Sequence, residues 1–347
     1  MGLGNSTRCD SIIHQLITRG WKVSLVTAGN GLWYFRDRDY INHIYEIEEL
    51  RYGSKDGQIS INKTLGSVKT LASINKRNRG VISRALQEIQ PNAVISDSVY
   101  IFGLPTSRNI PWIALNNTDM VYQAFNYYPS KPLSIWPQFY CIEMIDYLFH
   151  KLGPDVVISP CIDLSIPLTH KKFHRVEPIV RQGFEQRLKR KEKSRVVIML
   201  SGSRFGSPVR LSNSEYPFQL DIIGRPAPTD WKVNEVIHYH GKVQDSLQLL
   251  RNADLAVVNG GFSAVSEVVC MGIPAVVVPV LRHAEQWVNA KSVDRLGIGT
   301  MAEESFIESA MLAAWDRLDD FNQSFDNLEL QGRGAQQSAD IIESVVS

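Results

Sequence analysis

The stretch NGGFSAVSEVVCMGIPAVVVPVLRHAEQWVN, residues 259–289, decides the fold because it alternates short strands and helices. The apolar run Asp254–Val258 just before it predicts a buried strand that ends at a glycine turn. Residues Ser263–Met271 carry apolar side chains at helical spacing, and Gly272 provides the stop. A second apolar run and a second helix follow. This alternation is typical of a parallel sheet covered by helices.

The turn at Gly260-Gly261 is the first candidate ligand site. Glycine has no side chain, so the backbone there can approach a ligand closely. A helix that begins on such a turn presents free N–H groups and the positive end of its dipole, which suits a phosphate. With Asn259, Phe262 and Ser263 the turn forms a predicted phosphate cradle, although many α/β proteins use such a turn only for packing.

Polar residues after the turn strengthen this interpretation. Glu267 lies one turn into the helix, and Glu285-Gln286 with Asn289 follow the next strand. A carboxylate can accept two hydrogen bonds from the vicinal hydroxyls of a ribose, and an acid–amide pair matches the hydroxyls of a sugar. Taken singly, Glu267 is as well explained by a solvated helix position, but the whole constellation favours a nucleotide-sugar site.

The motifs NGGFSAVSE, GIPAVVVP and HAEQWVNA resemble the donor-site region of GT-B glycosyltransferases, in the group of MurG and the UDP-glycosyltransferases. The resemblance is specific over Val236–Gly299 and looser elsewhere. It implies two Rossmann-like α/β domains facing a cleft, with a UDP-sugar held mainly by the C-terminal domain. By this resemblance the glycine turn would meet the diphosphate, Glu267 the ribose, and Glu285 with Gln286 the sugar hydroxyls.

Two further loops of the second half are candidate donor contacts. The small-residue turn after the strand in RVVIMLSGS, Ser201, Gly202 and Ser203, could offer hydroxyls and N–H groups to phosphate. The segment HYHGKVQDSL resembles the family's loop before the donor helix, where Gly241 and Val243 would meet the base. No metal is expected, since neither histidine of this segment has a partner at metal-ligand spacing and no D-x-D pair suggests a metal-held diphosphate. No cofactor is expected either, because the nucleotide sugar is a co-substrate.

Length and composition fit a two-domain globular protein. The chain has 347 residues, 44% apolar and 21% charged, with a formal net charge of +1. Such a balance does not predict a nucleic-acid partner. The four cysteines are far apart and form no metal-spaced cluster, which favours a reduced cytoplasmic setting. The sequence contains no run of eighteen or more apolar residues, so it predicts no membrane span.

The order of elements places the domain boundaries. We expect an acceptor-side α/β domain over 1–175, a charged linker over 176–193 and a nucleotide-sugar domain over 194–347. In the first domain, strands are predicted over Trp21–Ala28, Ala93–Asp97, Pro111–Asn116 and Asp155–Ser159, and helices over Cys9–Arg19 and within Asn62–Gln90.

The N-terminus GLGNSTRC resembles the first glycine loop of the same family, with two departures. The family has an apolar strand before this loop, whereas only Met1 precedes Gly2, so we expect a truncated start or a sheet without that strand. Many of these enzymes carry a histidine in the loop as general base, and here the position is Asn5. An amide can orient a hydroxyl but cannot take its proton.

Asp97 is the leading substitute for the base, because it ends a predicted parallel strand, where open α/β sheets bind ligands. A role as helix or turn cap is an equal alternative. Asp119 is a further candidate, whereas His14 is better explained by packing. Arg8 could meet an anionic acceptor or the donor diphosphate.

The segment Tyr122–Leu152 is rich in aromatic residues, which could stack on sugars or hold a lipid tail, although core packing explains them as well. The predicted function is transfer of a sugar from a UDP-linked donor to a hydroxyl acceptor, lipid-linked or a glycan. Contact with the inner face of a membrane would fit a lipid-linked acceptor. The alternatives are a nucleotide-sugar 2-epimerase and an inactive relative that binds a nucleotide sugar.

Overall fold

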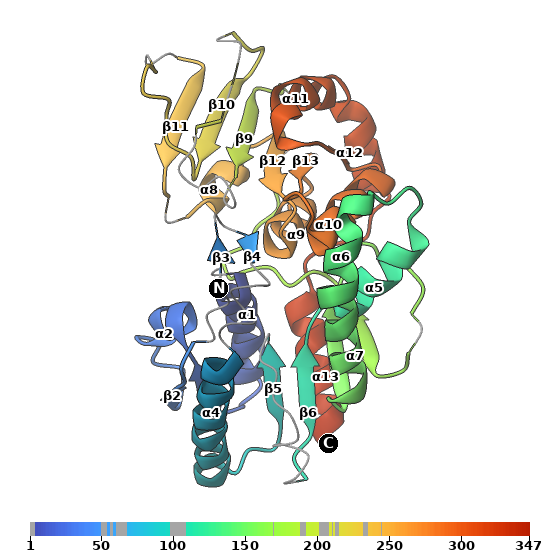
Figure 1. Cartoon of the computed structure of the whole chain (residues 1–347). Coiled ribbons are helices and arrows are strands. Elements are labelled where there is room, and N and C mark those ends of the chain that lie inside the picture. The colour runs from blue at the N-terminus through green and yellow to red at the C-terminus, as the bar shows by residue number, and fades with distance from the viewer. Residues whose placement is uncertain are drawn as a thin grey trace.

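The computed structural model describes residues 4–49, 54–55, 58–59, 68–97, 109–168, 170–187, 192–200, 208–209, 211, 215–231, 235–243 and 245–347. In this part of the chain two α/β halves lie one above the other, the N-terminal half below in Figure 1.

The N-terminal half consists of the elements α1 (Gly4–Thr18), β1 (Leu25–Thr27), α2 (Gly29–Phe35), β2 (Ile44–Glu46), β3 (Ser54–Lys55), β4 (Gln58–Ile59), α4 (Val68–Ile89), β5 (Val94–Asp97), β6 (Trp112–Leu115), α5 (Thr118–Tyr127), η2 (Leu133–Ile135), α6 (Trp136–Gln138), the π-helix η3 (Phe139–Glu143), α7 (Met144–Leu152), β7 (Val156–Pro160) and β8 (Phe173–Val176).

The C-terminal part consists of β9 (Arg195–Met199), β10 (Gln219–Ile223), β11 (Ile237–Gly241), α8 (Leu247–Leu250), β12 (Leu255–Asn259), α9 (Phe262–Cys270), β13 (Ala275–Val278), α10 (Ala284–Arg295), β14 (Gly299–Met301), η4 (Glu304–Phe306), α11 (Ile307–Asp316), α12 (Leu318–Asp326) and α13 (Gly334–Val346).

The C-terminal sheet is parallel, with the strand order β11-β10-β9-β12-β13-β14. From β9 the sheet continues through β10 to β11 on one side, and from β12 it continues through β13 to β14 on the other. The strand order therefore reverses between β9 and β12. Open α/β sheets bind ligands at the carboxyl ends of the strands beside such a reversal. The turn that follows β12 at Asn259 therefore lies where a ligand is expected.

The strands of this sheet are apolar on both faces because helices cover both. Val258 and Val277 pack in one core cluster with residues of α9 and α10, while Val257 and Val276 pack in another with residues of α11 and α12. This explains why short continuous apolar runs, rather than alternating ones, predicted these strands.

The N-terminal half holds a parallel sheet of order β5-β6-β7-β8 and a separate parallel pair, β1 with β2. The predicted strands of this half are confirmed, with β1, β5 and β6 shorter than expected and β7 shifted by one residue. The helix expected within 62–90 is confirmed as well. The helix expected to begin at Cys9 begins at Gly4 instead, so the loop-like residues Asn5 and Ser6 lie in its first turn.

The chain passes between the halves at two adjacent segments. One segment follows β8, and the other leads into α13. The helix α13 packs on α1 and the N-terminal sheet, not on the nucleotide-sugar domain in which the sequence analysis placed it (Figure 1). Buried Glu177 ties the two segments together. Its carboxylate accepts hydrogen bonds from Arg333 Nε at 2.7 Å and from the backbone N–H groups of Gln331 and Arg333 at 2.9 and 3.1 Å.

A core cluster also joins the halves next to the predicted site. Phe125 of α5 and Phe139 of η3 stack with ring centroids 3.7 Å apart and share a cluster with Ala284, Trp287 and Val288 of α10. Phe125, Tyr128, Phe139 and Tyr147 are buried, as the packing alternative predicted, whereas Tyr127 and Tyr140 are exposed.

Candidate functional site

The two glycines of the turn before α9 have different surroundings. A Cβ atom on Gly260 would lie 2.7 Å from the backbone oxygen of Gln286, so this glycine lets the turn pack against α10. A Cβ atom on Gly261 would meet nothing within 4 Å, and the φ of Gly261 is an ordinary −63°. Neither packing against the described residues nor backbone strain requires a glycine at position 261, and the space beside it is open.

The first turn of α9 faces the first turn of α1 from the other half (Figure 1). A Cβ atom on Gly4 would lie 2.5 Å from Ser263 Oγ, so the two helix starts are in contact. Helix starts offer backbone N–H groups and the positive end of a helix dipole. Two such ends brought together would favour an anion at the boundary between the halves.

Three of the predicted donor residues shape this turn. Asn289 is 2% exposed, and its Nδ2 donates to the backbone oxygen of Gly260 at 2.9 Å. Gln286 Oε1 accepts from the backbone N–H of Val280 at 2.9 Å, and Asn259 Nδ2 donates to the oxygen of Val278 at 3.3 Å. Asn289 thus supports the glycine turn directly, whereas Gln286 and Asn259 bind the backbone at the end of β13 and after it, roles that sequence spacing alone did not reveal.

Glu267, predicted to bind the ribose, is bound by an arginine from the segment between the halves. Arg181 donates from Nε to Oε1 and from Nη2 to Oε2, both at 2.6 Å, and its Nη2 also reaches Ser246 Oγ at 3.2 Å. Burial alone would lower the pKa of Arg181, but the hydrogen bonds to Glu267 raise it above its ordinary value. No sequence pattern predicts this pair, because its members lie far apart in the chain.

Asp97, predicted as the base, is the buried partner of Arg8. Arg8 Nε donates to Asp97 Oδ2 at 2.8 Å, Arg8 Nη2 pairs with Oδ1, and Cys9 Sγ donates to Oδ2 at 3.1 Å. Burial would lower the pKa of Arg8, but the charge of Asp97 raises it beyond its ordinary value. Burial, reinforced by Asp97, raises the pKa of the Cys9 thiol. The base role of Asp97 stays a prediction. In that role Asp97 would accept the proton of the acceptor hydroxyl while it is paired with the guanidinium of Arg8.

The other candidate bases are packed elsewhere. Asp119 is fully buried and pairs with Arg175 at 2.9 Å, so it belongs to the core of the N-terminal half. His14 lies 3.7 Å from Asp10 and against the ring of Tyr40. Neither arrangement directs the side chain to the glycine turn.

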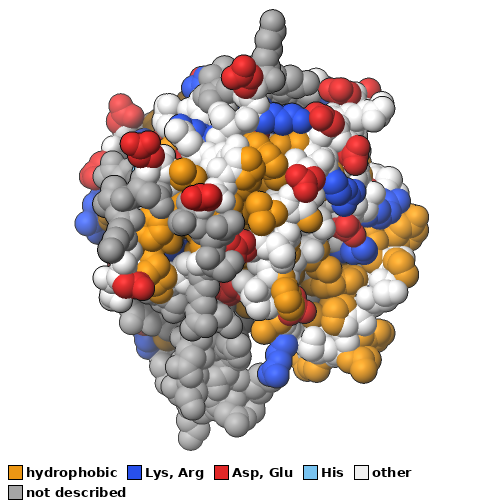
Figure 2. Space-filling view, turned by 90° about the horizontal axis from the view of Figure 1, so that it is seen from above, with side chains coloured by type: hydrophobic (Ala, Val, Ile, Leu, Met, Phe, Trp, Pro, Cys, Tyr) orange, Lys and Arg blue, Asp and Glu red, His pale blue; other side chains and the backbone are white. Residues whose placement is uncertain are grey.

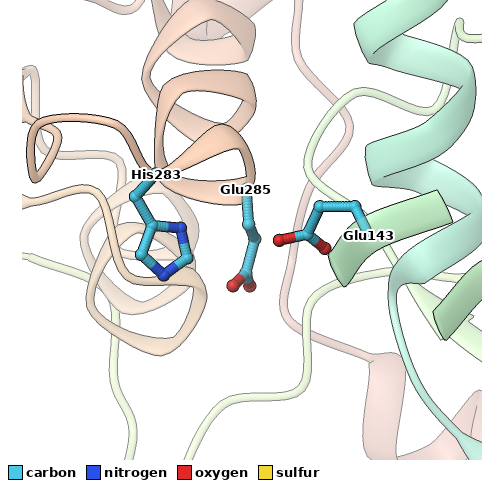
Figure 3. Close-up of side chains that lie close together, drawn as sticks. All are labelled: Glu143, His283 and Glu285. Atoms are coloured by element: carbon cyan, nitrogen blue, oxygen red, sulfur yellow. The ribbon is translucent and has the colours of Figure 1, made fainter. Parts of the chain in front are cut away.

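Glu285, predicted to bind the sugar, stands in the first turn of α10 close to two other titratable side chains. Glu143 of η3 and His283 share with it a group whose metal-ligating atoms all lie within 4.8 Å of one another (Figure 3). These three side chains could hold a cation, although the positive end of α10 opposes one there. Glu143 and His283 come from opposite halves, and the sequence motifs did not single out Glu143.

Glu143 occupies an unusual environment for a carboxyl group. It is 7% exposed, and burial followed by the nearby charge of Glu285 raises its pKa well above the ordinary value of 4.5. Gln138 Nε2 donates to Glu143 Oε1 at 2.6 Å, and Gln138 Oε1 accepts from the backbone N–H of Ala284 at 2.8 Å. One glutamine thus fixes Glu143 to the start of α10.

The remaining predicted contacts lie along the C-terminal sheet. Gly241 ends β11 with a φ of +61°, which favours glycine, and a Cβ there would meet nothing within 4 Å. Val243 packs beside the core cluster of α9. The predicted phosphate contacts Ser201, Gly202 and Ser203 lie outside the described residues.

Solved structures share this architecture. A MurG from Acinetobacter baumannii superposes with a TM-score of 0.61 and 14% identity over 98% of this chain and 96% of its own. The structure of LpCGTa in complex with UDP gives a TM-score of 0.67 with 12% identity over 100% and 97%. An uncharacterized glycosyltransferase of Methanosarcina acetivorans is 23% identical over 330 residues, 88% of this chain and 84% of its own.

The two parallel α/β halves, meeting at a glycine turn, define a GT-B glycosyltransferase, an enzyme that transfers sugars. The model of glycosyl transferase family 1 matches residues 1–317. The chain belongs to this family.

Proposed function

We propose that the enzyme transfers a sugar from a UDP-linked donor to a hydroxyl group of an acceptor at a membrane surface. The donor diphosphate would lie beside the contact between the starts of α1 and α9, in the open space at Gly261. The single observation that carries this proposal is the contact between Gly4 and Ser263, which brings two helix starts to one point. Fixed N–H groups aimed at the departing diphosphate would stabilise the charge that develops on it.

The rest of the donor would extend along α9 and α10. Glu267 would accept hydrogen bonds from the ribose while Arg181 holds it, because each carboxylate oxygen has more than one lone pair. Glu285 would bind hydroxyls of the donor sugar, with Gln286 fixed beside it. Asn5 would orient the acceptor hydroxyl from the first turn of α1, with Asp97 as the proposed base.

The membrane part of the proposal rests on an apolar helix face. Ile142, Ile145, Leu148 and Leu152 recur at helical spacing along η3 and α7, and all are exposed, Leu152 at 76%. Leu133 nearby is 86% exposed. Hydrophobic side chains gather at the lower right of the face in Figure 2. Contiguous exposed apolar surface of this kind marks interaction sites, and a bilayer or a lipid-linked acceptor would cover it.

No helix in the described part of the chain has the length and apolar character needed to cross a bilayer. In the proposed arrangement the helix face described above rests on the membrane surface.

The test is to incubate the protein with radiolabelled UDP-sugars, with and without lipid-linked and glycan acceptors. UDP released only when an acceptor is present supports transfer. A changed sugar without acceptor would support the 2-epimerase alternative, and tight UDP binding without turnover would support the inactive relative. UDP binding that is absent altogether would contradict the donor proposal.

A further inference from the structure

The side chain of Glu285 is held by a residue of the opposite half. Asn117, in the N-terminal half, donates from Nδ2 to Glu285 Oε1 at 3.2 Å. In the described part of the chain this is the one hydrogen bond that the Glu285 carboxylate accepts. Both side chains are half-buried, so a ligand can still reach the carboxylate. A carboxylate offers about four acceptor positions, which leaves most of them for hydroxyl groups of a ligand.

The backbone of Asn117 is fixed on both sides. Asn116 before it is buried, and its backbone N–H donates to the oxygen of Ile158 in β7 at 3.0 Å. After it, the backbone N–H of Val121 donates to the oxygen of Asn117 at 3.1 Å and so closes the first turn of α5. Asn117 therefore lies at a fixed junction between a strand and a helix.

The start of α5 does not explain an asparagine at position 117. Asparagine is among the best residues for capping a helix, because its side-chain oxygen can accept from a backbone N–H of the first turn. Asn117 immediately precedes α5 but makes no such bond, and Asn116 Oδ1 accepts from the N–H of Thr118 at 2.7 Å instead. The amide of Asn117 is thus left to bind Glu285 across the boundary.

Packing between the halves sets the distance between the two residues. Val121 of α5 shares a core cluster with Trp287 and Val288 of α10. Asn117 lies one turn before Val121, and Glu285 lies in the first turn of α10. Both side chains therefore extend from the starts of helices that pack against each other, so their hydrogen bond does not depend on a loop.

We propose that Asn117 is a positioning residue for the donor-sugar subsite: it fixes the direction of the Glu285 carboxylate, which then binds hydroxyl groups of the donor sugar. A hydrogen bond to one oxygen restricts the rotation of a carboxylate, so less side-chain entropy is lost when the sugar binds. Asn117 acts through Glu285 and not by a contact of its own with the sugar. This inference rests on the proposed UDP-sugar site.

Titration calorimetry with UDP, UDP-glucose, UDP-galactose and UDP-N-acetylglucosamine tests this without any acceptor. For the sugar nucleotide that the wild-type protein binds most tightly, the measured quantity is the ratio of its dissociation constant to that of UDP. Asn117→Ala should raise this ratio about threefold to tenfold, the effect of one hydrogen bond, while the affinity for UDP is unchanged. Asn117→Asp, which keeps the shape but removes the amide donor, should raise the ratio at least as much.

A double variant shows whether Asn117 acts through Glu285. Glu285→Ala should raise the ratio at least as much as Asn117→Ala, and the two substitutions together should raise it no further than Glu285→Ala alone. Asn126→Ala, at an exposed position of the same helix, is the matched control and should leave the ratio unchanged. Additive effects of the two substitutions would show that Asn117 contributes independently of Glu285, and would overturn the inference.

The inference is also wrong if Asn117→Ala or Asn117→Asp leaves the ratio unchanged, or if Asn117→Ala lowers the affinity for UDP and for the sugar nucleotide alike. If Glu285→Ala leaves the ratio unchanged, the proposed role of Glu285 fails and the inference fails with it. Failure of UDP to bind the wild-type protein would instead remove the whole donor site on which the inference rests. The UDP measurement therefore separates these failures.

Discussion

Arg181 binds both carboxylate oxygens of Glu267 at 2.6 Å, and so connects the segment between the halves to the second turn of α9. A planar guanidinium paired with a carboxylate in this way fixes its direction as well as its charge. The side chain proposed to receive the ribose is therefore oriented before any nucleotide arrives.

Replacement of Glu267 tests its contact with the nucleotide. We expect Glu267→Ala to weaken UDP binding by about 1–3 kcal/mol, the range for a lost charged hydrogen bond. Titration calorimetry with UDP measures the change, and Glu215→Ala is the control. Arg181→Ala should weaken binding less, because it removes only the group that orients Glu267. An unchanged UDP affinity in Glu267→Ala would exclude Glu267 from the site.

The two glycines of the turn predict opposite effects of the same substitution. Gly260→Ala should destabilise the protein by about 1–3 kcal/mol, since the new methyl meets the backbone of Gln286. Gly261→Ala should leave the free energy of unfolding nearly unchanged yet weaken UDP binding at least tenfold, because its methyl fills the space of the diphosphate. Denaturant unfolding and calorimetry measure the two effects. Normal UDP binding by Gly261→Ala would refute the cradle.

A double variant separates the two roles open to Asp97. Asp97→Asn alone should lower stability by about 3–5 kcal/mol, because Arg8 stays buried without its partner. If Asp97 is the base, turnover should also fall by roughly two to four powers of ten. Adding Arg8→Gln should restore most of the stability, and we expect turnover to stay slow. A double variant with near wild-type turnover would show that Asp97 is only the partner of Arg8.

The raised pKa of Glu143 predicts how stability depends on pH. The unfolded carboxyl titrates near 4.5, and the folded one titrates higher because of burial, Glu285 and Asp146. The folded state therefore binds more protons between these values, and stability falls as the pH rises through that window, by at most about 1.4 kcal/mol per pH unit. Urea unfolding of wild type and Glu143→Gln over this range should show the loss only in wild type.

The apolar face of α7 predicts binding to lipid vesicles. Full burial of one aliphatic side chain contributes about 1.5–3 kcal/mol, so Ile145→Ser with Leu152→Ser should reduce vesicle binding at least tenfold. Cosedimentation with vesicles of neutral and anionic lipid measures this. Phe306→Ser, at a 60% exposed position of the C-terminal half, should have no effect. Equal loss in both variants would contradict a specific membrane face.

The sequence predicted the elements that depend on local pattern. Short apolar runs identified the buried strands, and the glycine turn identified the start of α9. Both features depend on the residue types within a few neighbouring positions, so the sequence shows them directly. The resemblance to GT-B glycosyltransferases added the class of enzyme, which the fold and the family match confirm.

Contacts between distant residues could not be predicted in this way. Nothing within the segment around Arg181 indicates that it meets Glu267, and Glu143 reads as one acidic residue among aromatic ones. The return of α13 to the N-terminal half was also missed, because an amphipathic helix does not specify which sheet it covers. Asn289 was predicted as a donor-binding residue, but its side chain hydrogen-bonds the backbone of Gly260 and so supports the turn.

The two connections between the halves touch each other at Glu177 and Arg333, so they act as one narrow neck. Had they been spaced apart, they would have blocked most relative rotation. Adjacent, they define an axis through the neck, and rotation about it is opposed by the side-chain contacts of the boundary, such as the core cluster of Phe125, Phe139 and Trp287. The largest displacement would then fall on the parts of the boundary farthest from this axis.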